Sequence, residues 1–119
     1  MGNPIGWFEV VGQDTVKLKG FYGELFDWKL EDMEEMPYTV ADPGEDGLRG
    51  GIGPDPSGGE GHVTFYVSVD EVESSLARVE ELGGAKVVGP IDIPNGRIAL
   101  FSDPEGHVIG LLEGGGSAA

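Results

Sequence analysis

The sequence contains no cysteine, and it has only seven basic residues against 22 acidic ones. The absence of cysteine excludes disulfides and zinc sites built from thiolates. The formal charge of -15 disfavours nucleic acid, whose phosphates would repel this surface, and it also disfavours an anionic membrane face. No apolar run approaches the roughly 20 residues of a membrane span, and no signal peptide precedes Ile5. We therefore expect a cytoplasmic protein with neither a nucleic-acid partner nor a membrane partner.

The acidic excess itself has two interpretations, and the sequence does not choose between them. Solvated carboxylates keep a protein soluble. Acidic surfaces are also tolerated at high salt, where mobile ions screen their mutual repulsion.

The chain of 119 residues has the length of one domain, and it contains two similar halves. Segments 8–14 and 65–70 are both short strands that end in aspartate before a helical pattern. Each half then reads strand, helix and three strands. We therefore predict an α+β fold made of two βαβββ modules in one domain, 1–119. Module 1 covers about 5–53, a connector covers 54–61, module 2 covers about 62–113, and a flexible tail covers 114–119.

Local signals define the ends of several elements. Asp14 and Asp70 are expected to cap the two helices, and Gly83 or Gly84 is expected to end the second one. The segment Asp103–Gly106 has proline and glycine where a tight turn needs them. Strands are expected at 5–11, 28–34, 38–41, 48–53, 62–69, 87–93, 97–101 and 107–112.

The alternation of side chains predicts which face of each strand is buried. Between His62 and Val69 the apolar residues are expected beneath a helix: Val63, Phe65, Val67 and Val69. The other set is expected on an open face: His62, Thr64, Tyr66 and Ser68. By the repeat, Trp7 and Glu9 share that open face. An apolar stripe on the first helix is expected to face the sheet: Val16, Leu18, Phe21, Tyr22, Leu25 and Trp28. Two half-sheets that curl toward each other would form a cleft, the usual place for a small ligand.

Four short motifs, in this order and spacing, resemble the vicinal oxygen chelate superfamily. They are Phe21–Trp28, Val69–Val72, Glu81–Gly84 and Asp103–Gly106. That superfamily includes glyoxalase I, bleomycin-resistance proteins, fosfomycin-resistance enzymes and extradiol dioxygenases. The resemblance implies a glyoxalase-like domain with a half-barrel cleft, and it implies a homodimer.

The resemblance also implies where a metal would be held. Metal-using members carry histidine, glutamine or glutamate ligands on the first and last strands of each module. Those positions fall here on Trp7, Thr64 and Gly110, with the fourth-strand position somewhere in Arg49–Gly53. Indole and glycine offer no donor to a divalent ion. We therefore expect no cofactor, and a divalent metal is disfavoured.

Two residues are candidates for acid–base catalysis. Glu9 shares the face of Trp7, and a carboxylate desolvated by an indole is a common general base. The alternative is an edge glutamate bound to a cation or to water. His62 shares the face of Thr64 and could exchange a proton near neutral pH, or it could be a surface residue at the start of a strand. His107 has the opposite parity to Gly110, so the two histidines are not expected to form a metal pair.

The remaining candidates would bind a ligand. Trp7, Tyr66 and Phe101 could form an aromatic wall that stacks on a flat or cationic molecule, or they could be ordinary core residues. Arg49 could hold an anion, or it could balance nearby carboxylates. Thr64 and Gly110 are also candidates, because they lie at positions where the resemblance implies ligands.

Three functions remain open from the sequence. The first is a metal-independent protein that binds a small organic molecule in an aromatic cleft. The second is a glyoxalase-like enzyme, of lyase, isomerase or dioxygenase type, that uses Glu9 or His62 as acid or base. The third is a regulatory or interaction module whose cleft is closed by side chains.

Overall fold

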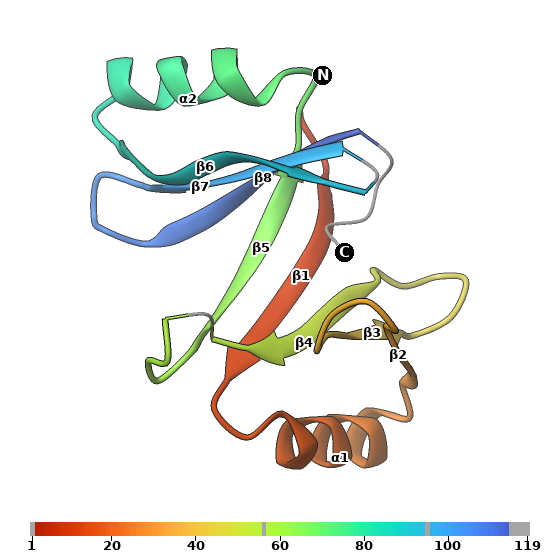
Figure 1. Ribbon diagram of the computed structural model, residues 1–119. Coiled ribbons are helices and arrows are strands. Elements are labelled where there is room, and N and C mark those ends of the chain that lie inside the picture. The colour runs from red at the N-terminus through yellow and green to blue at the C-terminus, as the bar shows by residue number, and fades with distance from the viewer. Residues whose placement is uncertain (1, 56, 95, 115–119) are drawn as a thin grey trace. The chain divides into compact units, whose positions relative to one another are not determined.

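The computed structural model describes residues 2–55, 57–94 and 96–114 (Figure 1). Over these residues the chain forms two helices and eight strands in the order βαβββ, βαβββ. The elements are β1 (Ile5–Gly12), α1 (Thr15–Phe26), β2 (Lys29–Asp32), β3 (Thr39–Asp42), β4 (Gly50–Pro54), β5 (His62–Ser68), α2 (Val72–Glu81), β6 (Ala85–Ile93), β7 (Gly96–Ser102) and β8 (Val108–Gly114). This order confirms the predicted α+β fold with two βαβββ modules.

The chain divides into two compact units. The first-half unit is Phe8–Val63, and the second-half unit combines the chain up to Trp7 with the chain from Thr64 onward. The division therefore falls within β5, between Val63 and Thr64, and within β1, between Trp7 and Phe8. The predicted cleft between the two halves, and the predicted domain boundaries, stay predictions. The predicted tail lies outside the described residues except for Gly114, which ends β8.

In the first-half unit the strands lie in the order β2-β3-β4-β1. Strand β1 runs parallel to β4, with Phe8 beside Gly50 and Glu9 beside Gly51, while β2, β3 and β4 are antiparallel neighbours. Helix α1 begins after Asp14, whose Oδ1 accepts a hydrogen bond from Lys17 N at 3.0 Å. This contact confirms the predicted N-cap.

Helix α1 buries less of its apolar stripe than the sequence predicts. Leu18, Tyr22 and Trp28 are partly buried, but Val16, Phe21 and Leu25 are more than half exposed. An aromatic cluster joins the partly buried side to the sheet, since the Trp28 ring lies 5.3 Å from Phe8 and 5.8 Å from Tyr22. The remainder of the predicted stripe therefore lies on the surface of this chain.

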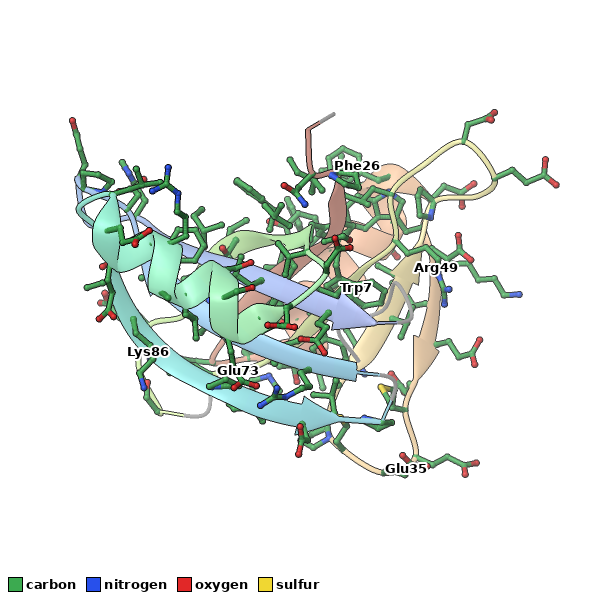
Figure 2. The ribbon with its side chains drawn as sticks, turned by 90° about the horizontal axis from the view of Figure 1, so that it is seen from above. Trp7, Phe26, Glu35, Arg49, Glu73 and Lys86 are labelled. Atoms are coloured by element: carbon green, nitrogen blue, oxygen red, sulfur yellow. The ribbon has the colours of Figure 1, made fainter. Side chains whose placement is uncertain are left out.

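In the second-half unit the strands lie in the order β5-β8-β7-β6, and α2 packs on β6, β7 and β8. The core under α2 consists of Val72, Leu76, Ala99 and Leu111, with Val69 and Phe101 packed against it. On the outer part of this interface the Glu73 carboxylate on α2 contacts the Arg97 guanidinium on β7 (Figure 2). Helix α2 ends as predicted, because Gly83 has a φ of 99° and Gly84 N donates to Val79 O at 2.9 Å.

The predicted faces of β5 are wrong for its first residues. Val63 is 70% exposed and Phe65 is 36% exposed, whereas Thr64 and Tyr66 are buried. The reason is that α2 covers β6 to β8 and leaves the start of β5 uncovered. Only Val69, just beyond β5, reaches the cluster beneath the helix.

The predicted cap of α2 is also wrong. Glu71, and not Asp70, precedes the helix, and it makes no side-chain capping bond. Instead Val72 N donates to Oε1 of Glu113 at 2.8 Å, so the cap comes from β8, far along the chain.

The β7–β8 turn forms as predicted. Gly106 N donates to Asp103 O at 2.9 Å, and Gly106 has a φ of 91°, which favours glycine. The Asp103 carboxylate accepts from the backbone N–H of Glu105 and of His107. The His107 backbone bond is the main reason that the pKa of Asp103 lies below its usual value. Within the described residues neither helix is long and apolar enough to span a membrane.

Candidate functional site

The two faces of β1 have different roles. Phe8 lies on the face toward α1, where its ring packs against Trp28 and lies over Gly50. Glu9 has the opposite parity and lies on the other face, away from the helix. We call this second face of the first-half unit the Glu9 face.

A tyrosine holds Glu9 on this face. The Tyr38 hydroxyl donates to Glu9 Oε2 at 2.8 Å, and the Tyr38 side chain is buried. Tyr38 directly precedes β3, and its backbone is fixed on both sides: its N–H donates to Met36 O and its carbonyl accepts from Met33 N. The carboxylate therefore receives a directed hydrogen bond from a side chain whose position the chain defines locally.

Glycines in β4 provide the space for the Tyr38 ring. A Cβ atom added to Gly51 would lie 1.8 Å from Tyr38 Oη, and one added to Gly53 would lie 2.8 Å from Tyr38 Cδ1. Gly51 is the β4 neighbour of Glu9. The glycines that weaken the prediction of β4 as a strand are thus explained by an aromatic ring that lies across them.

In the second-half unit a tyrosine ring also lies against a strand glycine. Tyr66 on β5 is the register neighbour of Gly110 on β8, and a Cβ atom added to Gly110 would lie 2.3 Å from Tyr66 Cδ2. The structure therefore brings together two of the predicted residues, Tyr66 and Gly110. Because Phe8 and Phe65 are equivalent in the repeat, Glu9 with Gly51 corresponds to Tyr66 with Gly110. This register places the fourth-strand metal position, which the sequence left within Arg49–Gly53, at Gly51.

The four positions that hold a metal in the resembled superfamily do not fit a metal here. They are Trp7, Gly51, Thr64 and Gly110. Trp7 is fully buried, and the Thr64 hydroxyl already donates to Val108 O at 2.7 Å. Tyrosine rings fill the space beside both glycines. Within the described part of the chain, no three histidine, aspartate or glutamate side chains are grouped so that they could hold a metal ion.

Arg49 lies among carboxylates. Its side chain is exposed, and its Nε lies 3.9 Å from Asp42 Oδ2 (Figure 2). It borders a hollow of about 280 Å³ together with acidic residues of β2 and the turn after it: Glu31, Asp32, Glu34 and Glu35. A hydrogen bond from the Thr39 hydroxyl, and then Lys19, hold the pKa of Asp32 below its usual value. This setting agrees with the charge-balancing interpretation of Arg49.

Phe101 lies on the opposite face of its sheet from Tyr66. Its register neighbour on β8 is Ile109, whereas Leu100 is the neighbour of Gly110. Phe101 packs against the cluster beneath α2. The prediction that Phe101 shares an aromatic wall with Tyr66 is therefore wrong, because the strand register places the two rings on different faces.

His62 begins β5 and is exposed. It borders a hollow beside α1, together with Asp14 and Lys17. His107 is also exposed, and its Nδ1 lies 3.0 Å from Asp103 Oδ2 in the β7–β8 turn.

The sequence analysis missed Tyr38. A signal for it was present, since a strand with glycine at 50, 51 and 53 has little side chain of its own and needs a large neighbour to fill the face. The sequence pattern does not say which of the nearby aromatic residues fills it.

Comparison with known proteins decides the family. The family model described as "Glyoxalase/Bleomycin resistance protein/Dioxygenase superfamily" matches residues 4–111 of this chain. The chain belongs to this superfamily. This result confirms the resemblance found in the sequence motifs.

Similar sequences of the superfamily are longer than this chain. A protein of Mycobacterium tuberculosis (strain CDC 1551 / Oshkosh), named "Putative glyoxylase CFP32", is 32% identical over 77 residues, which are 64% of this chain and 30% of that protein. The "Anthracycline biosynthesis protein DnrV" of Streptomyces peucetius is 27% identical, covering 91% of this chain and 48% of that protein. The chain thus spans less than half the length of these curated relatives.

Solved structures share the fold at low sequence identity. Hypothetical protein BH1468 from Bacillus halodurans C-125 has a TM-score of 0.69 at 16% identity, covering 100% of this chain and 99% of that one. Methylmalonyl-CoA epimerase from Mycobacterium tuberculosis has a TM-score of 0.62 at 15% identity, covering 93% of this chain and 87% of that one. These likenesses concern the fold alone.

Proposed function

We propose that this superfamily member binds a small organic molecule on the Glu9 face without the metal that other members use. The observation that supports this proposal most directly is the tyrosine ring that lies against Gly51 in β4 and the one that lies against Gly110 in β8. A tyrosine ring beside these positions supports a site without metal ligands, and the Tyr38–Glu9 pair adds a polar group that can orient a ligand. Trp7, Thr64, Tyr66 and Gly110 stay proposed ligand-binding residues in the second-half unit.

The proposed ligand is a flat aromatic molecule, either neutral or cationic. Aromatic side chains favour such ligands by stacking. The formal charge of -15 disfavours anions. The name of one relative, DnrV, refers to anthracycline biosynthesis, and anthracyclines are polycyclic aromatic compounds.

A fluorescence titration with acridone, a neutral flat tricyclic compound that is not a metal chelator, tests this proposal. We expect saturable binding, with a Kd of about 1–100 μM for such a small ligand. Tyr38→Phe and Glu9→Gln should each weaken binding about three- to tenfold, because they remove the polar anchor. Binding that stays unchanged in both variants would overturn the assignment to the Glu9 face.

A second candidate function is acid–base catalysis by Glu9, and the Tyr38–Glu9 hydrogen bond is the observation that favours it. An oriented carboxylate could take the proton from a carbon beside a carbonyl, leaving an enolate, and could return it to either face. Incorporation of solvent deuterium into such a substrate, followed by NMR, would detect this step. The enzyme hypothesis predicts that Glu9→Gln abolishes the exchange in a folded protein. His62→Ala tests His62 as the alternative acid or base, and exchange unchanged in both variants would remove both assignments.

We also propose that the protein is a homodimer. Leu25 and Phe26 at the end of α1 are more than half exposed, and neighbouring exposed large apolar side chains are typical of an interaction surface. Sedimentation should give the mass of two chains, and Leu25→Lys with Phe26→Lys should shift the mass to one chain if this face is the interface. A wild-type mass of one chain at micromolar concentration would contradict the proposal.

A further inference from the structure

A hollow of about 760 Å³ lies beside α1 in the first-half unit. It is bordered by the end of β1, by the first turns of α1 and by the residues that lead into β5. The hollow is bordered by α1, which lies on the face of β1 that carries Phe8.

The loop that closes this hollow is fixed by hydrogen bonds. Asp55 N donates to Gly12 O at 3.1 Å, and the Gln13 side chain donates to Gly59 O at 3.2 Å. The Asp55 carboxylate accepts hydrogen bonds from the Ser57 hydroxyl and from Gly61 N. The bond from the Ser57 hydroxyl is the main reason that the pKa of Asp55 lies below its usual value. Asp55 and Gly59 are therefore held against the end of β1 and Gln13.

Gly61 shows how closely this loop approaches the strand. Its φ is 91°, and a Cβ atom there would lie 2.0 Å from Val11 O. Both observations require glycine. Gly61 thus borders the hollow at a point where the chain lies directly against the backbone of β1.

Apolar side chains border the hollow from two elements. Phe21 on α1 is 60% exposed and Val63 on β5 is 70% exposed, although both are large apolar residues. Leu18 and Tyr22 also border the hollow, and the Phe21 and Tyr22 rings meet edge to face at 5.1 Å. Exposed apolar groups around a concave surface are typical of a binding site.

The charged side chains at the hollow favour a positive ligand. Two carboxylates, those of Asp14 and Glu60, border it with one ammonium group, that of Lys17. The local excess is therefore negative, and the whole chain carries -15. Aromatic faces such as those of Phe21 and Tyr22 also attract cations.

We propose that this hollow is a second small-molecule site, selective for organic cations with a flat or apolar body. Phe21 and Val63 contribute the apolar contact, and Asp14 and Glu60 attract the positive charge. This site lies apart from the Glu9 face, so it does not depend on the function proposed there.

Fluorescence anisotropy with rhodamine 6G, a cationic xanthene dye with a flat apolar body, tests the proposal on the full chain. Fluorescein, a xanthene of similar shape and negative charge, is the matched anion. We expect saturable binding of rhodamine 6G with a Kd of about 1–100 μM and at least tenfold weaker binding of fluorescein. No saturable binding of rhodamine 6G, or equal binding of the two dyes, would overturn the proposal.

Two sets of variants locate the bound dye. The double variant Phe21→Ala with Val63→Ala should weaken rhodamine 6G at least about tenfold. Its control is Leu48→Ala with Val87→Ala, which shortens exposed apolar side chains that do not border the hollow. Asp14→Asn keeps a capping oxygen for α1, and together with Glu60→Gln it should weaken the dye about threefold to tenfold. Glu45→Gln with Glu105→Gln, at exposed positions, is the control for charge. Equal affinities in a test pair and its control would overturn the placement in the hollow.

The two proposed sites can be told apart. Tyr38→Phe and Glu9→Gln should weaken rhodamine 6G binding much less than Phe21→Ala with Val63→Ala does, and the Phe21/Val63 variant should leave acridone binding unchanged. If rhodamine 6G binding falls in Tyr38→Phe and not in the Phe21/Val63 variant, the hollow is not the site. If the wild type binds rhodamine 6G but not acridone, the proposal for the Glu9 face is wrong and the proposal for the hollow stands.

Discussion

The hydroxyl of Tyr38 donates to Glu9 Oε2 at 2.8 Å, across strands that are far apart in sequence. The ring that carries this hydroxyl lies over Gly51, the β4 neighbour of Glu9. The position of the Tyr38 ring, its hydrogen bond to Glu9 and the lack of a side chain at Gly51 thus depend on one another. In the second-half unit a tyrosine ring also lies against a strand glycine, Gly110, but there the tyrosine is Tyr66, which occupies the position that corresponds to Glu9.

Removing the Tyr38 hydroxyl should destabilise the protein. Tyr38→Phe leaves the partly buried Glu9 carboxylate without this donor, and hydrogen bonds to charged groups contribute about 1–3 kcal/mol. Urea unfolding measures the free energy change. Tyr22→Phe, in the aromatic cluster of α1, is the control, and an equal loss in both variants would contradict a special role for the Tyr38–Glu9 bond.

An alanine at Gly51 should be more harmful than an alanine at another glycine. The added Cβ would overlap the Tyr38 ring, so we expect a loss of about 1–3 kcal/mol in the free energy of unfolding. Gly20→Ala is the matched control, because nothing lies within 4 Å of its added Cβ and alanine favours a helix by about 1 kcal/mol. Thermal unfolding should therefore show opposite shifts, and a stabilising Gly51→Ala would contradict the placement of Tyr38.

The cap that Glu113 supplies to α2 gives a third prediction. Glu113→Ala removes the acceptor of Val72 N and should cost about 1 kcal/mol of stability, as the loss of other N-caps does. Glu113→Gln keeps an acceptor oxygen and should retain most of it. Asp70→Ala, at the position where the sequence predicts the cap, should change the unfolding midpoint much less. A larger loss from Asp70→Ala would mean that the cap lies where the sequence places it.

The β7–β8 turn should lose stability in acid. The folded-state pKa of Asp103 lies below its unfolded value of about 3.9, mainly because the His107 N–H donates to the carboxylate. A lowered pKa contributes stability that is present above the unfolded pKa and is lost as the pH falls through the folded pKa. Asp103→Asn should therefore flatten the fall of the melting temperature below about pH 4. Asp46→Asn, in another turn, is the comparison, and identical pH profiles for the wild type and Asp103→Asn would refute the prediction.

Much of the fold follows from local sequence signals. Asp14 caps α1, Gly83 and Gly84 end α2, and the Asp103–Gly106 turn joins β7 to β8 as predicted. Each of these features depends on residues a few positions apart, so the sequence pattern contains the whole interaction. The repeat of two βαβββ modules follows from the same signals.

The errors arise where a distant element decides the outcome. Alternation in β5 separates its two faces correctly, but the position of α2 over β6 to β8 leaves Val63 and Phe65 exposed. Glu113 replaces Asp70 as the cap because β8 brings its carboxylate to the helix. The same limitation applies to the candidate site. Glu9 is visible as a carboxylate on the face of Trp7, but its partner Tyr38 becomes evident only when the register of β1 and β4 is known.

The central claim is that the Glu9 face binds an organic ligand without a metal. Calorimetric titration of acridone into wild-type protein, once after treatment with EDTA and once with nickel and zinc added, tests it most directly. The account predicts the same affinity and one site per chain in both conditions. Binding that disappears after EDTA treatment and returns with a stoichiometric metal would contradict it.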